Sequence, residues 1–164
     1  MKKFNPAIIG ALLMLAYACN SGNDNKQSQT DSLSGSNAIQ SSRCYIAIDG
    51  ADTAYLNIQN LASGKVNGKM LINYSGKPNN TGTLAGEFKG DTLFADYTFT
   101  SGENKTVNKN PLAFLKEDSR MTLGVGTIET YLGRSYFAKG KPIDFERGRF
   151  KFDSLECKEQ KVIK

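Results

Sequence analysis

The feature that most constrains this chain is a hydrophobic period of two that recurs between residues 44 and 157. From Val66 to Tyr74 every second position is apolar or glycine, and the positions between them are mostly polar. The same alternation recurs over residues 83–89, 93–99 and 121–125. Because successive side chains of a β-strand point to opposite faces, each run predicts a strand with one buried and one solvated face.

Short turn signals separate these runs. They are Asp49-Gly50, Ser63-Gly64, residues 75–80, Lys89-Gly90-Asp91, Ser101-Gly102, Leu132-Gly133 and Arg147-Gly148. Such signals are typical of hairpins, so successive strands should pair antiparallel as a meander. No stretch between the runs has the caps and length of an amphipathic helix; residues 114–118 are the nearest candidate and are too short. We therefore expect an all-β domain over residues 44–157 with about 8–10 strands.

A meander of that size exposes two sheet edges unless it closes on itself. Gly68, Gly82 and Gly86 fall on the apolar side of adjacent predicted strands, where glycine permits the strong coiling of a small barrel. Closure would make the strands over residues 44–48 and 149–155 neighbours. The predicted fold is therefore a small closed antiparallel barrel, lipocalin-like in outline, and a two-sheet β-sandwich is the alternative.

The N-terminal segment has the pattern of a secretory signal. Lys2 and Lys3 precede an uncharged apolar run over residues 6–18. That run is shorter than the roughly 20 residues that a membrane-spanning helix needs, and a polar segment follows it. We expect residues 1–18 to be a signal peptide rather than a membrane anchor.

The residues Leu15 to Cys19 resemble a lipobox, in which small residues stand just before a lipidated cysteine. This resemblance implies cleavage after Ala18 and a lipid anchor on Cys19. The alternative is ordinary signal cleavage at the same bond, which leaves Cys19 as a free thiol. Residues 19–43 are dominated by Asn, Ser, Gln and Gly and cannot bury enough apolar surface to order themselves, so they predict a flexible tether.

This plan resembles the small envelope lipoproteins of Bacteroidota, in which a barrel-sized domain starts and ends at a cysteine. The resemblance implies a lipid-anchored position in the bacterial cell envelope. In that phylum an acidic stretch just after the cysteine usually signals export to the cell surface, and here only Asp24 is acidic in that stretch. The periplasmic face of the outer membrane is therefore the predicted location.

The two remaining cysteines, Cys44 and Cys157, stand at the ends of the predicted domain. In an oxidising exported compartment they predict a disulfide. Free thiols or a shared metal ion are the alternatives. The chain has neither a CxxC motif nor a histidine that could complete a zinc site, so we expect no metal and no cofactor.

Charge and composition restrict the possible functions. The full chain has a net charge of +5, and removal of Lys2 and Lys3 leaves +5 − 2 = +3. Both signs are interleaved along the domain without a basic stripe, which argues against nucleic acid as a partner. The surplus includes the lysines of the charged tail over residues 158–164. The lack of histidine removes the commonest general base, so we expect no enzymatic activity.

A barrel of this size is filled mainly by its aromatic side chains. One mouth could still hold a small apolar or amphipathic ligand, for which Tyr74, Tyr97, Arg120 and Arg134 are the candidate polar anchors. The simpler interpretation is that the tyrosines fill the core and the arginines are surface charges. We thus expect a small-ligand-binding barrel, and the alternative is an envelope module that binds another protein, senses stress or inhibits an enzyme.

Overall fold

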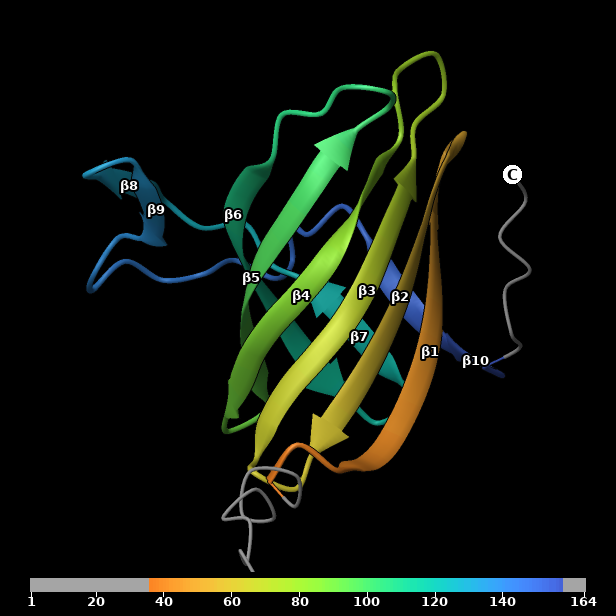
Figure 1. Cartoon of the computed structure of the whole chain (residues 1–164), viewed down its shortest axis with the longest axis vertical. Helices are drawn as coiled ribbons and strands as arrows, with labels where there is room; N and C mark the ends of the chain where they lie inside the picture. The colour runs from red at the N-terminus through yellow and green to blue at the C-terminus, as the bar shows by residue number, and fades with distance from the viewer. Residues whose placement is uncertain (1–35, 158–164) are drawn as a thin grey trace, which may run out of the picture.

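The computed structural model describes residues 36–157, in which ten β-strands form (Figure 1). The strands are β1 (Ile39–Asp49), β2 (Asp52–Leu61), β3 (Lys65–Asn73), β4 (Asn80–Lys89), β5 (Thr92–Ser101), β6 (Asn108–Glu117), β7 (Arg120–Leu123), β8 (Ile128–Tyr131), β9 (Arg134–Phe137) and β10 (Lys151–Leu155). Eight of them close an antiparallel barrel in the order β1-β10-β7-β6-β5-β4-β3-β2. β8 and β9 form a separate two-stranded hairpin. The barrel prediction is confirmed, and the chain does not form the alternative β-sandwich.

From β1 to β7 the barrel is a meander whose hairpin turns lie where the glycine signals predicted them. Gly50 and Gly90 each open a two-residue turn with φ of 60°, in the left-handed region that glycine adopts without steric cost. The meander is interrupted after β7, where residues 125–149 leave the barrel wall and contain the β8–β9 hairpin. The chain then returns as β10, between β7 and β1.

The first and last barrel strands are neighbours, as closure predicted. In the β1–β10 pair Cys44 lies opposite Leu155, and Ile46 lies opposite Asp153. Cys44 and Cys157 form a disulfide with their Cα atoms 5.1 Å apart, within the usual range for such a bond. The Asn57 side-chain amide of β2 donates a hydrogen bond to the Cys44 sulfur at 3.2 Å. The disulfide prediction is therefore confirmed.

The apolar positions that alternate along the predicted strands are the positions that face the interior of the barrel. On β3 the side chains of Val66, Met70 and Ile72 are buried, and the residues between them face outward. On β4, a Cβ atom added to Gly86 would lie 2.1 Å from the Phe94 carbonyl oxygen. A Cβ atom at Gly82 would lie 2.2 Å from the carbonyl oxygen of Thr98. Neighbouring strands thus approach these glycines more closely than any side chain allows, as their inward placement suggested.

Three boundaries differ from the predictions. Strand β1 begins at Ile39, inside the segment 19–43 predicted as a tether, because its polar residues still pair with β2 along the backbone. Strand β7 ends at Leu123 rather than at residue 125, since Val125 turns away to form an isolated bridge with Asp144. Strand β10 begins at Lys151 rather than at residue 149. The predicted signal 1–18, Cys19 and the tail 158–164 lie outside the described residues.

The barrel has two ends, which we name by their turns. The proximal end, where β1 begins, carries the turns at residues 62–64, 90–91 and 118–119. The distal end carries the turns at 50–51, 74–79 and 102–107. Parts of residues 125–149 cover the outer face of β5 and β6, so the outward-facing Ala113 is fully buried and Phe94 packs edge-on against Phe137 with ring centroids 6.5 Å apart.

Candidate functional site

The candidate anchor Tyr97 is part of the barrel core. Its side chain is 2% exposed, and its hydroxyl donates a hydrogen bond to the Met70 carbonyl oxygen at 3.1 Å. Its ring stacks on Phe99 with centroids 4.7 Å apart. Burial raises the pKa of the Tyr97 hydroxyl far above its ordinary value, and the nearby Tyr74 adds to the effect. Tyr97 therefore fills the interior and satisfies its own polar atom.

The other three candidates lie apart from a common site. Tyr74 follows β3 at the distal end and packs, half buried, against the core. Arg120, at the proximal end, forms an ion pair with Asp153 at 2.8 Å. Arg134, on the projecting hairpin, pairs with Asp96 at 3.5 Å. The structure brings the two tyrosines near each other and places the two arginines on the exterior, each with an acidic partner.

A pocket of about 200 Å³ opens instead at the proximal end of the barrel. We call it the proximal pocket. Four of its lining side chains are aliphatic or aromatic, namely Tyr45, Ile58, Phe88 and Met121, and they form the part that we call its wall. Its rim is polar and consists of Arg43, Asn60, Asp91 and Lys116, next to Gly90 of the β4–β5 turn.

The strand register explains why two cations reach this pocket. Arg43 pairs with Ile58 and Lys116 pairs with Met121, and both partners are buried in the interior. Directly opposed residues of an antiparallel pair share a face, so Arg43 and Lys116 lie on the inward face where the strands reach the rim. Each follows the inward-facing apolar residues of its strand toward the proximal end.

These two cations have no ion-pair partner within the described chain. Neither Arg43 nor Lys116 forms an ion pair with a carboxylate of residues 36–157, in contrast to Lys65, Lys109, Arg120 and Arg149. Burial raises the pKa of the Tyr45 hydroxyl, and the Arg43 guanidinium opposes that shift through its charge and a hydrogen bond. The rim thus carries two cations and the single carboxylate Asp91 above an apolar wall.

Sequence reasoning missed Arg43 and Lys116 for identifiable reasons. Arg43 lies in the polar segment predicted as tether, and Lys116 lies in the residues considered as a helix candidate. The signal was nevertheless present, because Arg43 precedes Tyr45 and Lys116 follows Phe114 by two positions. Extending the period of two by one step beyond each apolar run would have placed both side chains inside the barrel rim.

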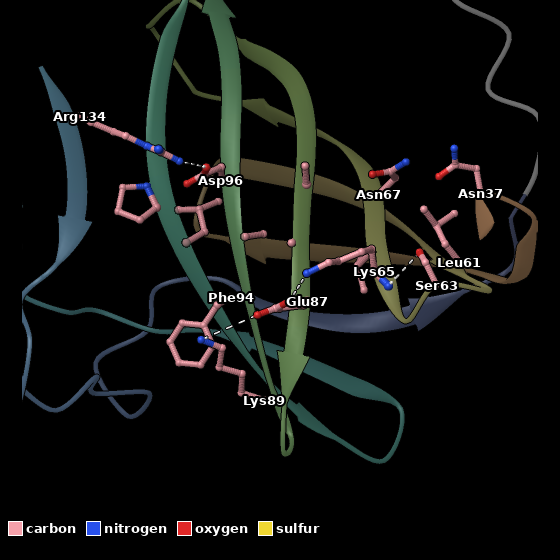
Figure 2. Close-up of a pocket in the computed structure, with 16 residues that line it drawn as sticks. Asn37, Leu61, Ser63, Lys65, Asn67, Glu87, Lys89, Phe94, Asp96 and Arg134 are labelled. Atoms are coloured by element: carbon pink, nitrogen blue, oxygen red, sulfur yellow. Dashed lines mark hydrogen bonds and ion pairs between the residues drawn. The ribbon is translucent and has the colours of Figure 1, made fainter. Parts of the chain in front are cut away.

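A larger hollow of about 740 Å³ lies on the outer face of β3 to β6, and we call it the outer groove (Figure 2). Its charges are already matched within the chain. Glu87 forms ion pairs with Lys65 and with Lys89, and Asp96 pairs with Arg134. The hydrogen bond from Lys65 is the main cause that lowers the pKa of Glu87. Every charged side chain in the outer groove is therefore already in an ion pair, although its three cations outnumber its two carboxylates.

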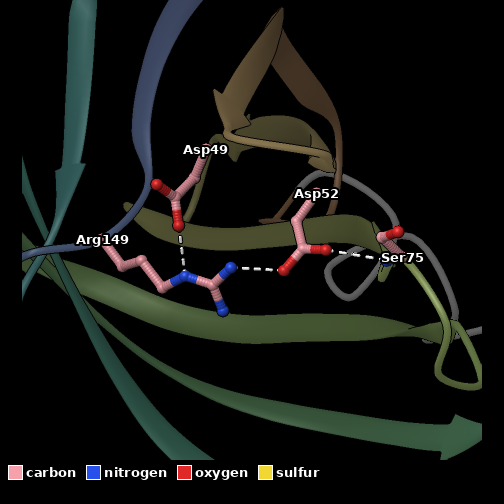
Figure 3. A network of polar contacts seen from close by, with 4 residues as sticks. All are labelled: Asp49, Asp52, Ser75 and Arg149. Carbon is pink, nitrogen blue, oxygen red and sulfur yellow. Dashed lines mark hydrogen bonds and ion pairs between the residues drawn. The ribbon is translucent and has the colours of Figure 1, made fainter.

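The distal end is tied together by a polar network (Figure 3). The Arg149 guanidinium donates to both Asp49 and Asp52, which flank the β1–β2 turn. The Ser75 backbone N–H donates to the second Asp52 oxygen at 2.7 Å, and this bond, followed by that of Arg149, lowers the pKa of Asp52. The network joins the segment before β10 to two distal turns and has a structural role.

In residues 36–157 there is no helix of the length and apolar character needed to cross a membrane. Comparison of the chain with protein-family models, with curated proteins and with solved structures gave no match. The assignment of a function therefore depends on the residues of the chain and their geometry.

Proposed function

We propose that this chain is a lipid-anchored cell-envelope protein whose barrel binds a small amphipathic anion in the proximal pocket. The observation that carries the proposal is the pair of inward-facing cations, Arg43 and Lys116, at the rim of a pocket with an apolar wall. The proposed role is binding rather than catalysis.

The chemistry of the pocket favours an anionic head with a short apolar portion. A carboxylate or phosphate oxygen at the rim would accept charge-assisted hydrogen bonds from the Arg43 guanidinium and the Lys116 ammonium. The apolar portion would contact Ile58, Phe88 and Met121. A volume of about 200 Å³ is smaller than the usual range for drug-sized ligands, roughly 300–1,000 Å³, so the bound portion is short.

The proposed anchor is Cys19, supported by the lipobox-like sequence before it. The described chain enters the barrel at Ile39, at the same end as the proximal pocket. A chain anchored at Cys19 on the periplasmic face of the outer membrane would therefore be joined to the membrane from the end that carries the ligand pocket.

Ligand binding is tested by native mass spectrometry of the chain purified from its own envelope, followed by calorimetric titration with octanoate. We expect a retained small anion in the native chain, and octanoate should compete for its site. The double variant Arg43→Gln/Lys116→Gln should bind octanoate at least tenfold more weakly, because each lost hydrogen bond to a charged group contributes about 1.5–3 kcal/mol.

Arg120→Gln is the matched control, since it removes an exposed cation from the same end that is already paired with Asp153. It should leave octanoate binding unchanged. Equal affinity in the native chain and the double variant would contradict the proposed site.

The anchor is tested by Cys19→Ser. This substitution should abolish incorporation of a radioactive fatty acid and release the protein from the membrane fraction. Labelling that persisted in the variant would contradict lipidation at Cys19.

A second candidate function is recognition of another envelope protein, and the outer groove is the observation that favours it. At about 740 Å³ it is larger than the proximal pocket, and the small exposed side chain of Ala85 lies in it. A photo-crosslinking residue at Ala85 should then capture one defined partner in intact cells, whereas the same residue at Ile48, outside the groove, should not. Capture at both positions or at neither would count against a specific partner.

A further inference from the structure

The β8–β9 hairpin exposes large apolar side chains away from the barrel. Leu132 is 87% exposed and Tyr131 is 70% exposed at the tip of the hairpin. Ile128 and Tyr136 are also exposed, at 49% and 44%. In Figure 1 the hairpin projects from the side of the barrel where β5 and β6 lie. These side chains therefore contribute little to the packing of the described domain.

The residue at the first position of the hairpin turn is also unusual for that turn type. Leu132 and Gly133 have φ of 48° and 73°, two consecutive positive values that mark a type I′ hairpin turn. The first position of such a turn favours Asn, Asp or Gly, because a branched apolar side chain is strained there, at a cost of about 1–3 kcal/mol. Leu132 thus brings strain and an exposed apolar surface without a compensating contact in the barrel. Such an outlier points to a role outside the domain.

The base of the hairpin is fixed to the barrel wall. Phe137 packs edge-on against Phe94, and Ala138 just after β9 is 5% exposed. At the other end of β9, next to the turn, Arg134 reaches back to Asp96 on β5. The hairpin is therefore held to the barrel both at its base and beside its turn.

The hairpin and the turn that follows its base carry a net positive charge. Residues 128–141 contain one carboxylate, Glu129, and three cations, Arg134, Lys139 and Lys141, which gives +3 − 1 = +2. Arg134 is paired with Asp96, whereas Lys139 and Lys141 are exposed in the turn after β9. That turn lies on the same side of the barrel as the hairpin tip (Figure 1).

An apolar tip with tyrosines beside it and lysines behind it matches the chemistry of a lipid bilayer interface. Leucine reaches the acyl boundary, tyrosine favours the headgroup level, and lysine is attracted to anionic phosphates. We propose that Tyr131 and Leu132 insert into the interface of an anionic bilayer while Lys139 and Lys141 contact its phosphate groups. This inference uses the membrane location in the proposed function and is independent of the small ligand.

The absence of tryptophan from the chain allows a direct test. The full chain carrying Leu132→Trp, and a matched chain carrying Ile48→Trp, are bound to vesicles of phosphatidylcholine with one quarter phosphatidylglycerol. Part of the phosphatidylcholine carries brominated acyl chains. Ile48 is the control because it is 71% exposed and lies on the barrel wall at β1. Fluorescence is recorded on the fraction that floats with the vesicles.

In the floated fraction, the L132W emission should shift to the blue and be quenched by bromine, and the I48W emission should do neither. Adding Lys139→Gln and Lys141→Gln to L132W should weaken insertion roughly thirtyfold, as expected for two lysines near an anionic surface. Vesicles of phosphatidylcholine alone should give little quenching of L132W.

Each other result would overturn the inference. Equal quenching of L132W and I48W, or none in L132W, would reject the hairpin contact while leaving the anchor intact. Strong quenching on neutral vesicles would reject the role of the lysines. Failure of both chains to float would reject the anchor and the hairpin contact together. An L132W emission shielded by a co-purifying protein in the absence of vesicles would assign the tip to a protein partner instead.

Discussion

Cys44 and Cys157 are joined at a Cα separation of 5.1 Å, although they are 113 positions apart in the sequence. The bond therefore connects the first barrel strand to the residues just after the last one. The disulfide thus links covalently the two ends of the barrel sheet that β1 and β10 already join by hydrogen bonds.

Replacing both cysteines by serine should lower the free energy of unfolding by about 2–5 kcal/mol, because the cross-link restricts the unfolded chain. Urea titration of the two chains measures the difference. Reduction and alkylation of the native protein should reproduce the loss. Two freely alkylatable thiols at Cys44 and Cys157 in protein taken directly from the envelope would contradict the bond.

Gly86→Ala should destabilise the barrel by about 1–3 kcal/mol, because the new methyl group would overlap the Phe94 carbonyl oxygen on the adjacent strand. Thr83→Ala provides the control in the same strand, since Thr83 is exposed. Thermal unfolding followed by circular dichroism compares the variants. A Gly86→Ala chain as stable as Thr83→Ala would show that the strands separate at little cost.

Asp52→Asn should destabilise the protein at neutral pH, with an effect that becomes smaller in acid. The pKa of Asp52 is lowered in the folded state, so its stabilising contribution is present above its ordinary pKa, near 4, and is lost as the pH falls through the lowered value. Urea midpoints at about pH 7 and about pH 2.5 test this. Glu156→Gln, at an exposed site, is the control. A difference between native and Asp52→Asn chains that stayed constant with pH would refute the electrostatic origin.

Tyr97→Phe should lower the free energy of unfolding by about 1 kcal/mol, since it removes a buried hydrogen bond and leaves the Met70 carbonyl oxygen without that donor. Octanoate binding should be unaffected, because Tyr97 lies in the filled interior rather than among the residues of the proximal pocket. A parallel loss of octanoate affinity would restore Tyr97 as a ligand anchor.

Much of the fold could be predicted because the alternation of side chains follows directly from the geometry of a strand. The inward placement of Met70, Gly86 and Leu93, and the meeting of Cys44 with Cys157, depend on that alternation and on closure of the sheet. Beyond β7 the hydrophobic period of two no longer predicts the arrangement of the chain. Residues 125–149 lie mostly outside the barrel wall, so the side of Gly124 that a side chain would occupy faces Ile143 and Phe145, although its backbone N–H still bonds to Ala113 of β6.

The candidate site was harder to predict than the fold. Tyr97 and Arg134 were considered for their chemistry, but the Tyr97 hydroxyl donates to the Met70 carbonyl oxygen and Arg134 is paired with Asp96. Arg43 and Lys116 were missed because polarity alone suggests solvent exposure. Their direction depends on the register with Ile58 and Met121, which a single sequence does not specify.

The junction between β1, β10 and the disulfide also determines how the barrel would respond to mechanical force. A pull on the chain ahead of Ile39 would first peel the short stretch before Cys44 from β2. At Cys44 the load would divide, because the covalent bond transmits part of it to Cys157 and from there to β10. Further rupture would have to detach β1 from β2 and β10 from β7 together. A protein pulled from its N-terminal side would therefore carry the force on two strands at once.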